Sequence, residues 1–374
     1  MTLRVRPSGP LRRLVWILPH PTPYNTYLLN GLADRLPTQT EAVFRWETMP
    51  SHPWTRLPAR RFSWRVSRQP GGRDKELESL AAHNTSSLVV FAGWRNRTMF
   101  PPLLARLRNG LPYAFWTDTP KGGTGLRRSV NNAAYCFFAR RAVTTLATGT
   151  PAIERYRVMG LPEDKLDSFP FVVDPDHFSP QSEEGAVRDG ACNRFIVCGR
   201  LLTKIKGQSV ALEALAKAIK ESRRPLELIV AGTGPDEPLL RQEAVRLGIA
   251  NAVHFIGWVE YDQLPTVLKQ CAALVMPSYW DPYPVAVLEA MASGLPVLGS
   301  LACGSVRERV VHGESGLIHE PGAAAALAEH MCWIATNHEQ AERMGLKSLA
   351  VSKSWGIEAA TAVVHRVIEK ANRR

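Results

Sequence analysis

Short apolar segments of strand length alternate with amphipathic segments of helix length along most of the chain. Apolar runs occupy residues 14–18, 87–91 and 195–197, and helical patterns follow at 24–35, 101–108 and 209–221. Such alternation is typical of parallel sheets whose strands are joined by helices. We therefore predict an α/β fold. Because 374 residues are many for one domain, we expect two domains.

A polar segment separates the two halves. Residues 175–193 are rich in Pro, Ser, Asp, Glu and Gly, which indicates a linker. We expect an N-terminal domain at 1–174, a C-terminal domain at 194–355, and a last helix within 356–374 that packs back toward the N-terminal domain. No internal sequence repeat relates the halves, so their expected similarity is architectural.

The net charge of +12 is concentrated near the start, where residues 1–70 hold 11 Arg against Asp34, Glu41 and Glu47. A basic surface attracts anionic partners such as phosphates, nucleic acid or an acidic membrane surface. The alternative is a solvated basic face that aids solubility. Nucleic-acid binding is suggested only by the positive charge. No nucleic-acid recognition motif accompanies that charge, so no specific nucleic-acid partner is expected.

The sequence predicts neither a membrane span nor a metal site. No stretch of 18 apolar residues occurs, and the run at 14–18 is too short for a signal peptide. Any membrane association is therefore expected to be peripheral. The six cysteines form no Cys-x-x-Cys pair and several lie in apolar surroundings, which favours reduced core thiols in a cytoplasmic protein.

Two carboxylates of particular interest, Asp281 and Glu289, lie on either side of a Pro-Tyr-Pro sequence. The prolines exclude a continuous helix between them, and we expect a helix over 284–293. Asp281 then lies in the preceding loop and Glu289 one to two turns inside, so both can approach a ligand at the helix N-terminus. N–H groups from Val285 onward could bind an anion there. Carboxylates for hydroxyls beside amides for phosphate suit a sugar nucleotide.

A basic loop, Gly199-Arg-Leu-Leu-Thr-Lys-Ile-Lys-Gly207, follows one expected strand and precedes a helix. Ligands of open α/β sheets bind at the carboxyl ends of strands. Arg200 and Lys206 are therefore placed to stabilise charge on a departing diphosphate. The alternative is a solvated basic loop.

Two further turns are candidate donor contacts. Gly232-Thr-Gly234-Pro235 resembles a phosphate-cradling loop, but the acids at 236–237 would repel a phosphate. We predict that this turn lets a nucleotide base or ribose approach the backbone, with a purely structural turn as the alternative. Glu308 ends a second strand-to-helix turn and is either a donor contact or a partner of the helix dipole.

In the first half, the loop at residues 20–26 and Asp118 are candidate acceptor contacts. Asn25 and Thr26 either cap the following helix or touch an acceptor or a phosphate. Asp118 follows an apolar strand and either meets a hydroxyl or forms an Asx turn. The basic segment at 121–128 is expected to be flexible.

With these motifs in place, residues 194–317 closely resemble the donor domain of the retaining glycosyltransferases of family 4, also called group 1. These enzymes have the GT-B fold, in which two Rossmann-like domains with parallel sheets face a central cleft. The resemblance rests on four motifs in the family's order and spacing, at 199–207, 232–235, 281–289 and 304–308. In the first half only 149–165 and 171–178 look similar to the family.

The resemblance implies a role for each motif. Arg200 and Lys206 would hold the donor diphosphate, Glu289 the ribose hydroxyls, and Asp281 the hydroxyls of the transferred sugar. Other expected donor contacts are Gly199, Gly232, Gly234, Tyr283, Pro284, Val285, Ala286 and Glu308. Enzymes of this family keep the anomeric configuration and as a rule require no metal, so no cofactor is expected beyond the nucleotide sugar itself.

The chain departs from the family pattern in three places. The first acid is commonly Glu, and Asp281 is one methylene shorter. A common Gly-Phe-Gly becomes residues 282–284, where Pro284 withholds an N–H, so phosphate contacts should shift to Val285 and Ala286. The usual Gly-Gly loop after the first strand is replaced by residues 20–26, which suggests a different way of handling the acceptor.

The leading hypothesis is a retaining, hexosyltransferase-like enzyme that moves a sugar from a nucleotide-diphosphate sugar to a glycan or lipid-linked acceptor. Such an enzyme would act in polysaccharide biosynthesis, peripherally at the inner face of the membrane, with the basic N-terminal half meeting anionic lipid. The alternatives are a catalytically silent GT-B protein that binds a nucleotide or glycan, and a GT-B epimerase or phosphorylase.

Overall fold

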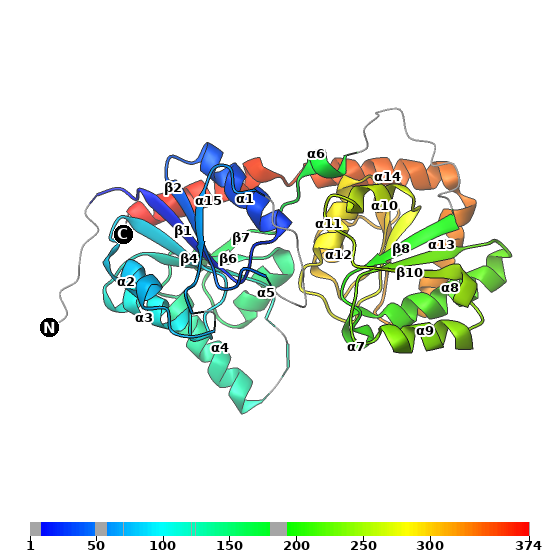
Figure 1. Cartoon of the computed structure of the whole chain (residues 1–374), viewed down its shortest axis with the longest axis horizontal. Helices are drawn as coiled ribbons and strands as arrows, with labels where there is room; N and C mark the ends of the chain where they lie inside the picture. Colours follow the sequence, from blue (N-terminus) through cyan, green and yellow to red (C-terminus); the bar gives the residue numbers. More distant parts are fainter. Residues whose placement is uncertain are drawn as a thin grey trace. The chain divides into compact units, whose positions relative to one another are not determined.

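The computed structural model describes residues 9–48, 58–69, 71–120, 122–123, 125–179 and 193–373. The chain divides into two compact units. Unit 1 comprises residues 1–172 with 357–374, and unit 2 comprises residues 173–356. Each unit contains one parallel sheet covered by helices (Figure 1). The predicted α/β fold with two Rossmann-like domains is therefore confirmed.

The sheet of unit 1 has seven parallel strands in the order β3-β2-β1-β4-β5-β6-β7. The strands are β1 (Arg13–Leu18), β2 (Gln39–Phe44), β3 (Ser63–Val66), β4 (Ser87–Phe91), β5 (Tyr113–Thr117), β6 (Thr145–Ala147) and β7 (Leu166–Ser168). The helices are α1 (Pro23–Arg35), α2 (Lys75–His83), α3 (Phe100–Arg108), α4 (Leu126–Ala139), α5 (Thr150–Val158), η1 (Glu163–Lys165) and α15 (Ile357–Asn372).

The sheet of unit 2 has six parallel strands in the order β10-β9-β8-β11-β12-β13. The strands are β8 (Arg194–Cys198), β9 (Glu227–Ala231), β10 (Val253–Gly257), β11 (Ala273–Met276), β12 (Val297–Ser300) and β13 (Gly316–His319). The helices are α6 (Pro175–Phe178), α7 (Thr203–Lys206), α8 (Gln208–Ser222), α9 (Glu237–Arg246), η3 (Ala250–Ala252), α10 (Leu264–Lys269), α11 (Val285–Ala292), α12 (Gly304–Arg309), α13 (Ala324–Thr336) and α14 (His338–Lys353).

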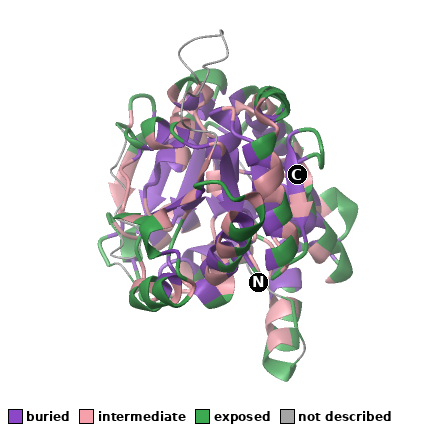
Figure 2. Ribbon diagram, turned by 90° about the vertical axis from the view of Figure 1, so that its right-hand side faces the viewer, coloured by how far each residue is buried: buried purple, intermediate pink, exposed green. Residues whose placement is uncertain are grey.

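The strand order reverses direction once in each sheet. It does so between β1 and β4 in unit 1 and between β8 and β11 in unit 2. Loops that leave neighbouring strands on opposite sides of such a reversal diverge, and open α/β sheets bind their ligands there. The central strands are buried, whereas the edge strands β3 and β10 are partly exposed and most other exposed residues occur on helices and loops (Figure 2). None of the helices in the described ranges is long and apolar enough to cross a membrane.

The C-terminal helix α15 is part of unit 1, where it lies beside α1 (Figure 1). The two helices approach closely at Gly31, where a Cβ atom would lie 2.2 Å from the Ile357 side chain. At the other end of α15, Lys370 Nζ lies 3.0 Å from Asp167 Oδ2. A small residue on α1 and an ion pair therefore hold the last helix against the N-terminal sheet.

Three local expectations are corrected by the structure. Helix α4 begins at Leu126, so the end of the segment expected to be flexible is helical. The start of the expected linker forms α6, because Asp174 caps its first turn by accepting from the Asp176 and His177 N–H groups. Residues 121, 124 and 180–192 lie outside the described ranges. The N-cap of α1 is Thr22, whose side chain accepts a hydrogen bond from the Asn25 N–H, so the expectation that Asn25 or Thr26 caps this helix is wrong.

Candidate functional site

Lys206 and Asp281 form an ion pair at the strand-order reversal of unit 2. Lys206 ends α7, which follows β8, and Asp281 lies in the loop that follows β11. Lys206 Nζ donates a hydrogen bond to Asp281 Oδ2 at 2.5 Å. Burial raises the pKa of Asp281, and the positive charge of Lys206 opposes that shift. The predicted diphosphate-binding cation and the predicted sugar-binding acid are therefore in direct contact.

Gly207 allows the loop after β8 to pack against the loop after β11. Its φ angle is +69°, and a Cβ atom at this position would lie 2.2 Å from the carbonyl oxygen of Pro277. Next to this contact, the Tyr279 N–H donates to the Ile205 carbonyl at 2.9 Å. Only glycine fits this left-handed turn at such close range, which explains the glycine in the motif.

The backbone around Asp281 is held by the turn that precedes α12. The Asp281 N–H donates to the Ala302 carbonyl at 3.2 Å, and the Gly304 N–H donates to the Asp281 carbonyl at 3.0 Å. A Cβ atom at position 304 would lie 1.9 Å from the Pro282 carbonyl oxygen. The glycine of the fourth motif thus permits close packing that positions the carboxylate of Asp281.

Glu289 is a buried carboxylate near the middle of α11. Helix α11 starts directly after Pro284, its N-cap, and Glu289 is 6% exposed. Burial raises the pKa of Glu289 to about 7. Within the described part of the chain no hydrogen bond or ion pair is made by its carboxylate. Such a group gains from hydroxyl donors that a ligand would bring.

Cys198, at the end of β8, marks the side of the sheet on which Glu289 lies. Burial raises the pKa of the Cys198 thiol well above its usual range, and the nearby Glu289 charge adds to the shift. Glu289 therefore lies beside the carboxyl end of β8, from which the loop bearing Arg200 and Lys206 departs. The sequence interpretation missed this neighbour because a cysteine in an apolar strand gives no functional signal by itself.

The turn at 232–235 packs directly on the loop after β8. A Cβ atom at Gly232 would lie 2.0 Å from the Gly199 carbonyl oxygen, and one at Gly234 would lie 2.3 Å from the Leu201 carbonyl oxygen. Arg200, between these contacts, is exposed. Its guanidinium forms no ion pair with the described residues. The two glycines therefore have a packing role, and Arg200 is accessible to a ligand.

The side chains of Tyr283 and Glu308 are hydrogen-bonded to each other. The Tyr283 hydroxyl donates to Glu308 Oε2 at 2.6 Å and accepts from Arg309 Nε at 3.2 Å. Burial raises the pKa of Tyr283, and only 4% of the residue is exposed. Glu308 is the fifth of the six residues of α12, so the alternative expectation that it partners the N-terminal helix dipole is wrong. Both side chains tie the loop before α11 to α12.

The other predicted donor contacts line the start of α11. Val285 and Ala286 are half-buried, and Pro284 is buried. The Pro284 φ angle of −63° sets the direction of the chain into the helix. The backbone N–H groups of Val285 and Ala286 lie in the first turn of α11, where helices offer donors to anions.

Unit 1 contains a cavity of about 330 Å³ at its own strand-order reversal. Tyr24, Trp116 and Phe171 form aromatic walls, and Asn25 and Asp118 contribute polar groups. Asn25 is 5% exposed, and its Oδ1 atom has no hydrogen-bond partner among the described residues. Asp118 is exposed at the rim, where its carbonyl oxygen accepts from the Tyr156 hydroxyl at 3.2 Å.

Two of the three predicted acceptor-side residues therefore share this cavity. Thr26 does not line it, because its side chain is buried within α1. The aromatic walls were not predicted, since they come from three separate segments and form no local motif. One sequence signal could have indicated an aromatic wall: Trp116 lies one residue before the end of the apolar strand β5.

Comparison with known proteins places the second half in a family. Residues 182–348 match the profile described as glycosyl transferases group 1. This segment is similar to the group 1 glycosyl transferases. It contains every donor-side residue predicted above, from Gly199 to Glu308. The acceptor-side residues lie outside the matched segment.

Curated relatives are similar to this chain over part of its length. D-rhamnosyltransferase WbpZ of Pseudomonas aeruginosa is 29% identical over 154 residues, which cover 41% of this chain and 39% of that protein. D-inositol 3-phosphate glycosyltransferase of Streptomyces scabiei is 32% identical over 220 residues, covering 54% of this chain and 48% of that protein. The chain thus matches less than half the length of these relatives.

Solved structures extend the likeness to both units. Anabaena HepE in complex with UDP and glucose has a TM-score of 0.74 at 17% identity, covering 96% of this chain and 99% of that chain. The apo form of the lipopolysaccharide outer core galactosyltransferase WaaB has a TM-score of 0.69 at 15% identity, with 96% and 99% coverage. These similarities confirm the predicted GT-B fold.

Proposed function

We propose that this protein is a retaining glycosyltransferase that moves a sugar from a nucleotide-diphosphate sugar to a hydroxyl of a glycan or lipid-linked acceptor. The observation that carries the proposal is Glu289. It is a buried carboxylate without a partner among the described residues, in a segment similar to group 1 glycosyl transferases, beside the strand-order reversal where α/β sheets bind ligands.

The donor is expected to bind across three loops of unit 2. Glu289 accepts hydrogen bonds from the ribose hydroxyls. Arg200, which is exposed, and Lys206 hold the diphosphate. Lys206 has three N–H donors, so it can keep one bond to Asp281 and give another to a phosphate oxygen. UDP is the first nucleotide to test, because HepE, with the same fold, was crystallised with UDP and with UDP-glucose.

The chemical step joins an acceptor oxygen to the anomeric carbon of the donor sugar. The bond from that carbon to the diphosphate oxygen breaks on the same face. The proton of the acceptor hydroxyl passes to the departing diphosphate. Arg200 and Lys206 stabilise the negative charge that collects on the diphosphate, and this effect is strongest where water is scarce. This route needs no metal, so we expect transfer to persist in the presence of a chelator.

The cavity of unit 1 is the proposed acceptor subsite. Aromatic walls suit the apolar face of a sugar ring, and the Asn25 amide and Asp118 carboxylate suit its hydroxyls. Among the described residues, neither Lys nor Arg lines the cavity. The group that enters it is therefore expected to be an uncharged, hydroxyl-bearing ring. A phosphate on the acceptor would lie outside this cavity.

Transfer assays with a panel of nucleotide sugars test the proposal. The wild type should turn over one donor, and Glu289→Ala and Arg200→Ala should each lose about 100-fold in kcat/KM. Lys217→Ala, an exposed change on α8, is the control. Equal activity of the wild type and the two site variants would refute the site. The anomeric configuration of the product decides whether the enzyme is retaining.

Two other outcomes would replace the proposal. Nucleotide binding by calorimetry without turnover of any donor would indicate a catalytically silent relative. A product that is an isomer of the donor sugar, or a sugar phosphate, would indicate an epimerase or a phosphorylase.

A further inference from the structure

Helix α4 carries an exposed apolar stripe. Leu126, Val130, Ala133 and Phe137 follow each other at spacings of four, three and four residues, which places them on one helical face. Leu126 is 82% exposed, Val130 57% and Phe137 46%. The helix extends away from the sheet of unit 1 (Figure 1), and its outer end is exposed (Figure 2). Contiguous exposed apolar side chains mark interaction sites.

The opposite face of α4 anchors the helix. Tyr135, Cys136 and Phe138 are buried in the core of unit 1. The Tyr113 hydroxyl donates to the Phe138 carbonyl at 2.8 Å, which fixes the C-terminal part of the helix. The stripe is therefore presented on a rigid support, and the core of its own unit leaves it uncovered.

Arginines flank the stripe. Residues 125–160 contain six Arg and a single acid, Glu154. Arg127, Arg140 and Arg155 form no ion pair with the described residues. Arg140 and Arg155 line a hollow of about 720 Å³ between α4 and α5, together with Phe137. Apolar side chains flanked by arginines that form no ion pair with a described residue make a surface complementary to an anionic, partly apolar partner.

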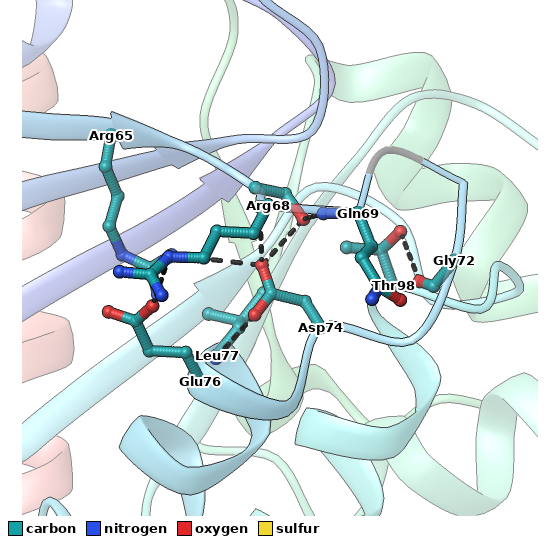
Figure 3. Close-up of polar contacts among 9 residues, drawn as sticks. Arg65, Arg68, Gln69, Gly72, Asp74, Glu76, Leu77 and Thr98 are labelled. Atoms are coloured by element: carbon teal, nitrogen blue, oxygen red, sulfur yellow. Dashed lines mark hydrogen bonds and ion pairs between the residues drawn. The ribbon is translucent and has the colours of Figure 1, made fainter.

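The arginines near the start of the chain differ, because many are neutralised by acids. Arg13 pairs with Glu41 at 3.2 Å and Arg61 with Asp34 at 3.0 Å. Around Asp74, Figure 3 shows Arg65 and Arg68 beside carboxylates, with Arg68 Nε 2.8 Å from Glu76 Oε2. The concentration of Arg in the first 70 residues therefore does not by itself mark the surface that attracts anions.

We propose that the α4–α5 surface (Leu126, Val130, Phe137, Arg127, Arg140 and Arg155) docks the protein on a bilayer that contains anionic lipid. Leu126 and Val130 enter the interface between headgroups and acyl chains, while the arginines contact lipid phosphates. A second copy of the chain is disfavoured as the occupant, because two such surfaces carry the same charge. Nucleic acid would use the arginines and leave the apolar stripe without a role.

Co-sedimentation with phosphatidylcholine vesicles, with and without phosphatidylglycerol, tests the proposal. The wild type should bind the anionic vesicles at least about tenfold more tightly, and added salt should weaken binding. Leu126→Ser with Val130→Ser, and separately Arg127→Glu with Arg140→Glu, should each lose about tenfold or more. The readout does not require transferase activity, so it stands apart from the test of the proposed function.

Unit 2 provides matched controls. Leu239→Ser with Val245→Ser changes two exposed apolar residues of α9, and Lys217→Glu with Lys220→Glu changes two exposed charges of α8. Both controls should bind vesicles as the wild type does. If a paired α4 variant fails to fold, Leu126→Ser alone serves, since that side chain is almost fully exposed.

Three results would overturn the proposal. The first is equal binding of the wild type to neutral and anionic vesicles. The second is unchanged binding by the α4 variants. The third is a wild-type dimer in light scattering that the α4 serine variant converts to a monomer, because the occupant would then be a second copy of the chain.

Discussion

Lys206 Nζ lies 2.5 Å from Asp281 Oδ2, and this contact joins the loop after β8 to the loop after β11. The two residues are 75 positions apart in the chain. Burial disfavours the ionised form of Asp281, and the Lys206 ammonium compensates for that cost. The pair therefore holds together the two side chains that we propose to bind the donor.

Replacing Lys206 with Ala should destabilise the protein. The change leaves the Asp281 carboxylate buried without its cation, and we expect a loss of about 2 kcal/mol in the free energy of unfolding, since Lys206 is partly exposed. Denaturant unfolding of Lys206→Ala, Asp281→Asn and the double variant measures the coupling. Lys204→Ala, an exposed change in the same turn, is the control. Additive effects of the two single changes would show that the pair contributes nothing.

Glu289→Gln should stabilise the protein at high pH. The folded-state pKa of about 7 lies above the ordinary value of 4.5. The protonated Glu289 therefore adds to the free energy of unfolding in full below pH 4.5, and this contribution is lost as the pH rises through 7. Above pH 7 the ionised group costs about 3 kcal/mol, which the amide avoids. Thermal or denaturant unfolding should show the variant more stable at pH 8 and equal to the wild type at pH 4. Equal stability at both values would contradict the burial argument.

The same residue should make nucleotide affinity depend on pH. The ionised carboxylate is the better acceptor for ribose hydroxyls, so affinity for UDP should fall as pH drops below about 7. Calorimetry between pH 5.5 and 8, values chosen to span about one unit or more on either side of that pKa, measures the slope. Glu289→Gln should bind more weakly and without that slope. A slope that survives in the variant would assign the titration to another group.

Gly234→Ala should destabilise unit 2. The added Cβ would lie 2.3 Å from the Leu201 carbonyl oxygen, so the backbone must shift, at a cost of about 2 kcal/mol. The matched control is Gly122→Ala, because no atom lies within 4 Å of a Cβ placed there. Denaturant midpoints compare the two variants. An unchanged midpoint for Gly234→Ala would mean that the turn is not constrained by this contact.

Tyr283→Phe separates packing from donor binding. The change removes the hydrogen bonds to Glu308 and Arg309 and should cost about 1–2 kcal/mol of stability. UDP affinity should change little, because the ring is buried away from solvent. Tyr279→Phe, at a residue that is 47% exposed, is the control. A large loss of UDP affinity at unchanged stability would instead show that the Tyr283 hydroxyl contacts the donor.

Much of the fold was predictable, because its signals are local. The expected helix over 284–293 corresponds to α11 at Val285–Ala292, where Pro284 precedes the first turn and Gly294, with a φ angle of +70°, follows the last. Strands β4 and β11 agree with their apolar runs to within one residue. By contrast, β2 has the sequence Gln-Thr-Glu-Ala-Val-Phe. It lacks a continuous apolar run, so burial in the sheet decides its conformation.

The sequence by itself determined that Asp281 stands outside a helix and Glu289 inside it, because proline and glycine restrict the backbone wherever they occur. Only the tertiary structure decided that Asp281 meets Lys206 and that Glu289 is buried with no partner in the part of the chain that the structure describes. Parallel strands bring loops from distant parts of the chain to one edge of the sheet. Contacts between such loops depend on strand order and packing, which no local pattern encodes.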